Sequence, residues 1–156
     1  VSVDHPVSLT LVSKLDPKGP SARLIEQLSI GDKVSVVSGL DDEELAALLA
    51  SAEIACVPSL YEGFSLPAVE AMSCGTPLVA TRAGAIPEVV GDAAVLVEPR
   101  NAEGLAEAIR DLLDDPDRAA ALGADGRRRV LDNYSWAAVA AATAERYRAA
   151  IAEEAS

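Results

Sequence analysis

Short apolar runs of strand length alternate along the chain with longer stretches in which apolar residues recur at helical spacing. The expected strands lie at residues 7–13, 34–38, 54–57, 77–81 and 94–97. Strands that alternate with helices over short links form a parallel sheet, and right-handed crossovers place helices on both of its faces. We therefore predict an α/β fold with a Rossmann-like, doubly wound parallel sheet.

The expected helices fill the links between these strands and continue beyond the last strand as an extra C-terminal helical segment. Ser21 and Ser135 are predicted N-caps, and Asp41 with Glu44 three residues later matches a capping box. Pro67 falls in the first turn of its helix, where the missing N–H of proline has no cost. The ranges predicted to be helical are 21–28, 41–50, 66–74, a short piece ending near 90, 102–113, 117–131 and 135–155.

Charge and composition exclude several classes of partner. The chain has 13 basic and 25 acidic residues, a net charge of −12, and only 3 % aromatic residues. Such a field repels nucleic acid and anionic lipid, and few aromatic rings are available to stack on bases. We predict no nucleic-acid partner, no transmembrane segment, and a cytoplasmic protein in which Cys56 and Cys74 are packed, reduced thiols.

The most informative stretch is residues 58–75, PSLYEGFSLPAVEAMSCG, which follows the third expected strand. The chain turns at Gly63 and enters a helix whose first amides have no partner within the helix. In parallel α/β sheets, ligands bind beyond the carboxyl ends of the strands, where loops lead into helices. A helix N-terminus also attracts anions, so this loop is a candidate site for a phosphate-bearing ligand.

Two carboxylates flank that helix start, Glu62 just before it and Glu70 eight positions later. Carboxylates repel a phosphate but accept strong hydrogen bonds from the vicinal hydroxyls of a sugar. This arrangement suits a sugar on Glu62, a ribose on Glu70 and a diphosphate between them. The plainer alternative is that Glu62 is a solvated loop residue and that Glu70 only favours the helix dipole.

This stretch resembles the E-x7-E motif of retaining glycosyltransferases with the GT-B fold, family 4, also called group 1. VSGLDDEEL before it, GTPLVATRAGAIPEVVG after it and NYSW near the end match segments of that family in the same order. The resemblance covers residues 9–151. It implies that residues 1–156 are the nucleotide-sugar-binding half of such an enzyme, with the acceptor domain elsewhere.

The resemblance also implies a role for each matching residue. Glu62 contacts the donor sugar and stabilises positive charge at the anomeric carbon, which makes it the catalytic candidate, and Glu70 binds the ribose. The implied donor-binding set is Glu62, Gly63, Phe64, Ser65, Leu66 and Glu70, and the implied base-binding set is Gly39, Leu40 and Glu44. Ser65 departs from the family, in which glycine is commoner, so the donor sugar stays open.

The phosphate-binding basic pair of this family has no clear counterpart. Lys14 and Lys18 match its pattern superficially, but they lie too close to the segment at residues 28–34. We therefore expect the chain to begin after the first strand-helix unit of its domain and to be inactive alone. The fold lets amides and basic side chains do the work of a divalent ion, so no metal and no cofactor are expected.

Other polar features have simpler explanations. His5 and Arg127, Arg128 and Arg129 are expected to be solvated, since such side chains are mostly exposed. Gly123 and Gly126 are not preceded by a strand, so they do not form a dinucleotide loop.

Two alternatives to the transferase remain open. One is a nucleotide-sugar epimerase or sugar phosphorylase of the same architecture. The other is a binding domain whose site has lost its catalytic function.

Overall fold

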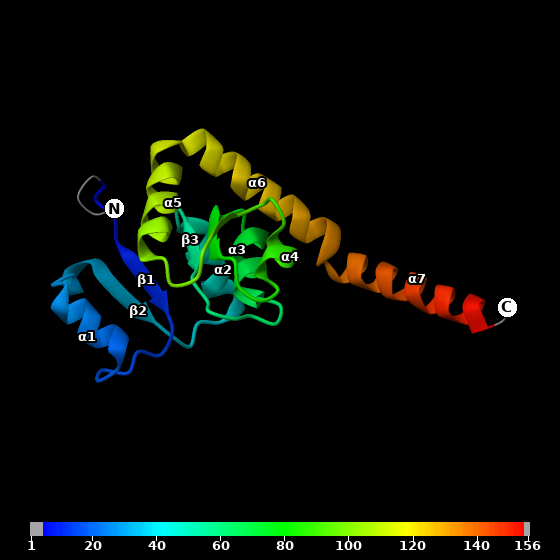
Figure 1. Ribbon diagram of the computed structural model, residues 1–156, viewed down its shortest axis with the longest axis horizontal. Helices are drawn as coiled ribbons and strands as arrows, with labels where there is room; N and C mark the ends of the chain where they lie inside the picture. Colours follow the sequence, from blue (N-terminus) through cyan, green and yellow to red (C-terminus); the bar gives the residue numbers. More distant parts are fainter. Residues whose placement is uncertain (1–4, 155–156) are drawn as a thin grey trace. The chain divides into compact units, whose positions relative to one another are not determined.

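The computed structural model describes residues 5–154, which divide into two compact units between Leu45 and Ala46. Both units are built from parallel strands and the helices that connect them (Figure 1). The α/β class predicted from the alternating pattern is therefore confirmed. The five strands form a two-stranded and a three-stranded hydrogen-bonded sheet, and each unit is described by itself below.

The first unit contains strands β1 (Leu9–Val12) and β2 (Val34–Val37), paired in parallel with Leu9 opposite Val34. Helix α1 (Pro20–Gln27) and the short 3-10 turn η1 (Gly31–Lys33) make the crossover between them. None of these four elements contains a fully buried residue.

The predicted cap at Ser21 is wrong. Helix α1 begins one residue earlier, at Pro20, and Gly19 is its N-cap without a side-chain hydrogen bond. The reason is that proline is already suited to the first helical position, so Ser21 falls inside the helix. Arg23 instead holds the preceding loop, by donating from Nε and Nη2 to the carbonyl of Lys18 at 3.1 and 2.8 Å.

The second unit contains a parallel sheet in the order β3 (Ala55–Val57), β4 (Leu78–Thr81), β5 (Val95–Val97). Helix α3 (Leu66–Ser73) connects the first two strands, and α4 (Ile86–Val90) connects the second two. The remaining helices are α2 (Asp42–Ser51), which spans the division between the units, α5 (Ala102–Asp114), α6 (Pro116–Asn133) and α7 (Trp136–Glu154).

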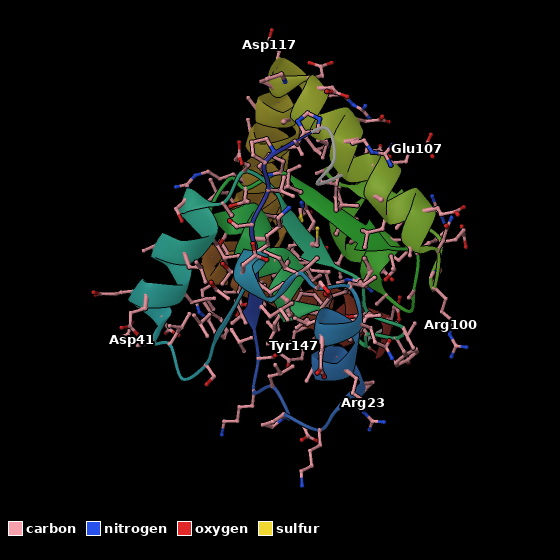
Figure 2. The ribbon with its side chains drawn as sticks, turned by 90° about the vertical axis from the view of Figure 1, so that its left-hand side faces the viewer. Arg23, Asp41, Arg100, Glu107, Asp117 and Tyr147 are labelled. Carbon is pink, nitrogen blue, oxygen red and sulfur yellow. The ribbon has the colours of Figure 1, made fainter. Side chains whose placement is uncertain are left out.

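The two faces of this sheet have separate apolar cores. Leu78 and Ala80 of β4 point to one face and pack among buried residues of α3 and α4, including Met72 and Ile86. Val79 points to the opposite face and packs against Leu112 and its neighbours on α5. This alternation is what a strand covered on both faces requires. Charged side chains such as Glu107 on α5 and Asp117 on α6 point outward (Figure 2).

Helix α6 approaches α3 closely because two of its residues lack a side chain at the contact. A Cβ on Gly123 would stand 2.1 Å from the carbonyl oxygen of Gly75, and one on Gly126 would stand 3.2 Å from Cγ of Met72. Both glycines are buried inside α6. The expectation that they do not form a dinucleotide loop is confirmed, and their purpose is helix packing.

The arginines of α6 are not simply a solvated face. Arg127 donates to the carbonyl of Ser73 at 2.7 Å, and Arg129 donates to the carbonyls of Glu88 and Val89, both at 2.7 Å. These carbonyls close the C-terminal turns of α3 and α4 and have no partner within their helices. Two of the three arginines therefore tie α6 to the helices that flank the candidate site.

Two further predictions concern single residues. The hydroxyl of Ser135 accepts from the amide of Ala138 at 3.2 Å, which confirms the predicted cap of α7.

Cys56 and Cys74 are both free thiols. Cys56 is less packed than expected, since part of its surface is exposed, but the surrounding protein desolvates the thiol and raises its pKa to about 11. Within residues 5–154, no helix is long and apolar enough to cross a membrane.

Candidate functional site

The loop between β3 and α3 enters its helix in an unusual way. Ser65, the N-cap residue, has φ 79° and ψ 71°, in the left-handed region, and its side chain makes no cap hydrogen bond. Glycine adopts this conformation without strain, whereas other residues adopt it at a cost. This explains physically why glycine suits the position of Ser65, which the sequence marked only as a departure.

The hydroxyl of Ser65 is buried and has no hydrogen-bond partner in the described part of the chain. The residue as a whole is 2 % exposed. An unpaired buried hydroxyl is destabilising. The loop therefore contains two local costs, one in the backbone and one in the side chain, at the same residue.

The rest of the helix tip faces solvent. Gly63 is exposed, Phe64 is 43 % exposed and Leu66 is 63 % exposed. Pro67 has no N–H and Ala68 is fully buried, so the first-turn amide left for a ligand is that of Leu66, and no side chain caps the helix. An exposed, uncapped helix start of this kind favours a phosphate group.

Glu62 is half-buried just before this tip and is held at two points. Its Oε1 accepts a hydrogen bond of 2.7 Å from the hydroxyl of Ser59, and its main-chain carbonyl accepts one of 2.9 Å from the amide of Ala85. The turn after β4 fits closely against it, since a Cβ on Gly84 would stand 2.2 Å from that carbonyl oxygen. No sequence pattern pointed to this contact, since Glu62 and Gly84 belong to different loops.

Glu70 is half-buried within α3, four residues after Leu66. Residues four apart share one face of a helix, and side chains tilt toward its N-terminus. Glu70 therefore lies on the same face of α3 as Leu66, one turn after the exposed tip. Its carboxylate makes no hydrogen bond or ion pair with the residues from 5 to 154, so it is available to a ligand.

An aromatic contact supports the loop from far along the chain. The rings of Phe64 and Tyr134 meet edge to face, with centroids 5.4 Å apart and planes at 83°. The hydroxyl of Tyr134 donates to the carbonyl of Val89 at 3.0 Å. The NYSW segment was matched to a family from the sequence, but no role was predicted for its tyrosine, Tyr134. Its contact with Phe64 shows that role only in the folded chain.

The predicted base-binding loop lies in the first unit. Gly39 is exposed with φ 73°, a conformation that suits glycine, and Leu40 is half-buried. Glu44 accepts a hydrogen bond of 3.0 Å from the amide of Asp41, and its own amide donates to the Asp41 carboxylate at 2.9 Å. The predicted capping box is thus confirmed, and Glu44 already has a structural use. A base-binding role for Gly39, Leu40 and Glu44 stays a prediction.

Lys14 and Lys18 are exposed in the loop after β1. The amide of Lys18 donates to the carboxylate of Asp16 at 2.9 Å, which shapes the loop as a local turn. Neither lysine side chain forms an ion pair within the described residues, in agreement with the solvated interpretation.

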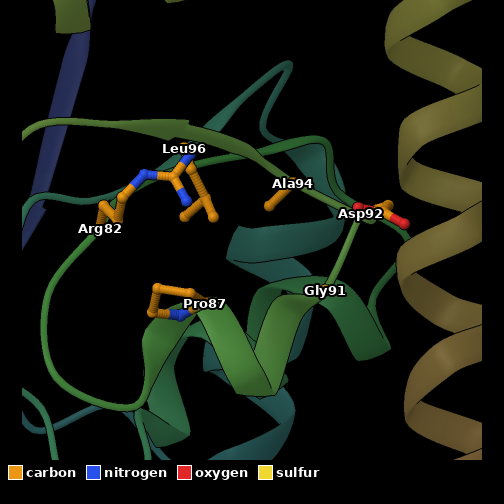
Figure 3. A pocket seen from close by; sticks show the side chains of 6 residues that line it. All are labelled: Arg82, Pro87, Gly91, Asp92, Ala94 and Leu96. Carbon is orange, nitrogen blue, oxygen red and sulfur yellow. The ribbon is translucent and has the colours of Figure 1, made fainter.

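A separate hollow of about 370 Å³ opens between α4 and the strands β4 and β5 (Figure 3). Arg82 and Leu96 lie on one side of it and Pro87 on the other, and Arg82 also forms an ion pair of 3.5 Å with Glu98. Its lining contains none of the predicted site residues and only one carboxylate, Asp92. We therefore place the candidate site at the loop of Glu62.

The described residues contain no group of three or more His, Cys, Asp or Glu that could hold a metal ion.

Comparison with known proteins gives consistent matches over this architecture. The family described as "Glycosyl transferases group 1" matches residues 9–129. An MMP alpha-(1->4)-mannosyltransferase from Mycolicibacterium hassiacum is 56 % identical over 157 residues, which cover 99 % of this chain and 38 % of that protein. The chain therefore spans about two fifths of the length of that relative.

Solved structures agree on the fold. A sucrose-phosphate synthase from Thermosynechococcus elongatus superposes with a TM-score of 0.80 at 36 % identity, covering 94 % of this chain and 39 % of that one. Anabaena HepE in complex with UDP-glucose superposes with a TM-score of 0.77 at 20 % identity, covering 91 % of this chain and 48 % of that one. At that identity, the second match supports the fold alone.

Proposed function

The chain belongs to the glycosyl transferases group 1 family, and from this premise we propose that it is the nucleotide-sugar-binding domain of a retaining glycosyltransferase. The complete enzyme transfers a sugar from a nucleoside diphosphate to an acceptor held by another domain of the same protein. The observation that carries the proposal is the exposed, uncapped tip of α3 with one carboxylate on the loop before it and another on its leading face. Residues 1–156 alone are expected to bind the donor weakly and to transfer nothing.

The proposed role of each group at the site follows from its charge. The tip of α3 carries partial positive charge and a free amide at Leu66, which suit the diphosphate. Glu70, on the same helix face as Leu66, accepts hydrogen bonds from the ribose hydroxyls. Glu62 accepts hydrogen bonds from the sugar and stabilises positive charge that develops at the anomeric carbon.

Retention follows if the acceptor attacks from the face on which the diphosphate leaves. The helix amides stabilise the departing diphosphate, and the rest of the protein supplies the acceptor and excludes water. The net negative charge of the chain does not oppose this, because first-turn amides act at hydrogen-bond distance against a screened global field. A cytoplasmic location, a base site at Gly39, Leu40 and Glu44, and independence of metals and cofactors remain parts of the proposal.

The name of one relative suggests which donor sugar to test first. The 56 % identical relative is named as a mannosyltransferase. We propose a hexosyl donor, with nucleoside-diphosphate mannose as the leading candidate. A thermal-shift panel of UDP-, GDP- and ADP-sugars on the full-length protein tests this, since a specific ligand raises the melting temperature by mass action.

Substitution of the two carboxylates in the full-length protein tests the site. Glu62→Gln and Glu70→Ala are each expected to reduce sugar transfer at least tenfold, or about 1.4 kcal/mol of transition-state stabilisation. Glu107→Gln, which neutralises an exposed carboxylate on α5, is the matched control and is expected to leave transfer unchanged. Near-normal turnover in both site variants would contradict the assignment of Glu62 and Glu70 to the donor site. An isomerised donor as product would instead favour the epimerase, and a sugar phosphate would favour the phosphorylase.

A further inference from the structure

Glu62 is connected to the end of β4 by a short chain of hydrogen bonds. The hydroxyl of Thr81 donates to the carbonyl of Ser59, and the hydroxyl of Ser59 donates to Oε1 of Glu62 at 2.7 Å. Thr81 is the last residue of β4 and is 3 % exposed, so it belongs to the rigid core of the second unit. The chain therefore runs from a buried strand to a half-buried carboxylate at the candidate site.

The bond between Ser59 and Glu62 constrains the carboxylate. A serine hydroxyl has a single hydrogen to donate, and here it goes to Oε1. The other oxygen of Glu62 has no hydrogen-bond partner among the described residues and is left to a ligand. A glutamate has three side-chain torsions, so without this bond its carboxylate would sample several rotamers.

The main chain on both sides of this bond is also fixed. The carbonyl of Ser59 is tied to Thr81, and the carbonyl of Glu62 is tied to the amide of Ala85 at 2.9 Å. Both partners lie on the segment from the end of β4 to the start of α4. The loop therefore presents the hydroxyl of Ser59 to Glu62 from a backbone that is anchored at each end.

We propose that Ser59 is a positioning residue that orients the carboxylate of Glu62 toward the donor sugar, and that Thr81 holds Ser59 in place. The inference rests on the proposed function, because it acts through Glu62. Ser59 does not touch the reacting atoms. Its contribution is to remove rotational freedom from a group that must be correctly placed in the transition state.

The test uses steady-state kinetics of the full-length protein, with nucleoside-diphosphate hexose as donor. Ser59→Ala is expected to lower kcat about tenfold while KM for the donor changes by less than about threefold, since the lost interaction orients a group needed in the transition state. Ser59→Thr keeps the hydroxyl and is expected to stay within about threefold of the wild type. Ser59→Cys keeps the volume but is a weak donor, and is expected to behave like Ser59→Ala.

Ser73→Ala is the matched control. Ser73 is also part-buried and donates a hydrogen bond of 2.7 Å, to the carbonyl of Glu70, but it lies at the far end of α3. Its removal is expected to leave kcat unchanged. Melting curves of all the variants identify any loss of activity that comes from unfolding, and Ser59→Cys carries the test if Ser59→Ala unfolds.

A double-mutant cycle distinguishes positioning from a general structural role. In a Glu62→Ala background, Ser59→Ala is expected to reduce transfer by less than about twofold more, because its target is absent. An equal loss in both backgrounds would overturn the inference, as would normal turnover by Ser59→Ala in a protein that depends on Glu62. Near-normal turnover by Glu62→Ala would instead overturn the proposed function itself.

Discussion

Helices α2 and α3 both begin directly after a loop that follows a parallel strand, but their N-termini differ. At α2, Asp41 and Glu44 satisfy each other's amides with two reciprocal hydrogen bonds. At α3, Ser65 has a left-handed backbone, its hydroxyl is unpaired and no side chain caps the helix. The first N-terminus is stabilised by its own side chains, whereas the second keeps its amides free at a cost in stability. That difference is one reason for our proposal that a ligand binds at the start of α3.

The largest expected effect comes from disturbing the turn that supports the α3 loop. Gly84→Ala is expected to lower the free energy of unfolding by about 3 kcal/mol, because its Cβ meets the Glu62 carbonyl and its φ of 55° is unfavourable for alanine. Chemical denaturation of the full-length protein measures this. Gly39→Ala, before α2, is the matched control, since it has φ 73° and no atom within 4 Å of its Cβ. It is expected to cost only about 1 kcal/mol, and equal losses at the two glycines would contradict the close fit at Gly84.

A change at Ser65 is expected to have the opposite sign. Ser65→Gly removes both the strained backbone and the unpaired hydroxyl, so the free energy of unfolding is expected to rise by about 2 kcal/mol. Ser65→Ala removes only the hydroxyl and is expected to gain less. Thermal or urea unfolding of the two variants separates the contributions. A loss of stability in Ser65→Gly would show that the hydroxyl has a partner that stabilises the folded protein.

The smallest expected effect is at the capped helix. Asp41→Ala removes a side-chain cap and is expected to lower the free energy of unfolding by about 1 kcal/mol, the usual value of an N-cap. Glu44→Ala removes the reciprocal bond and is expected to cost less. Urea denaturation again provides the measurement. An increase in stability on loss of Asp41 would mean that the two N-termini do not differ as described.

The same contrast shows what the sequence can and cannot predict. The capping box at Asp41 and Glu44 is local, with residue types that have one strong preference, and it was predicted and confirmed. The left-handed backbone of Ser65 could not be predicted in this way, because serine rarely adopts those torsions. The sequence showed only that serine stands where glycine is commoner in the family. The cap predicted at Ser21 failed because Pro20 was better suited to begin the helix.

Long-range contacts were the least predictable part of the candidate site. Glu62 and Glu70 were found from their spacing, but the hydroxyl of Thr81, the turn at Gly84 and the ring of Tyr134 reach the loop only in the folded chain. Each of these residues has an ordinary local explanation in the sequence, as a strand threonine, a turn glycine or a helix-end aromatic. Their tertiary partners, which no local pattern encodes, give them their role.

The most direct measurement is a crystal structure of the full-length protein with a bound nucleoside-diphosphate hexose. We expect the diphosphate within hydrogen-bond distance of the Leu66 amide, the ribose on Glu70 and the hexose on Glu62, with Ser59 still donating to Glu62. A ligand bound in the hollow beside Arg82, or a ligand at the α3 tip that leaves both carboxylates in solvent, would contradict the account.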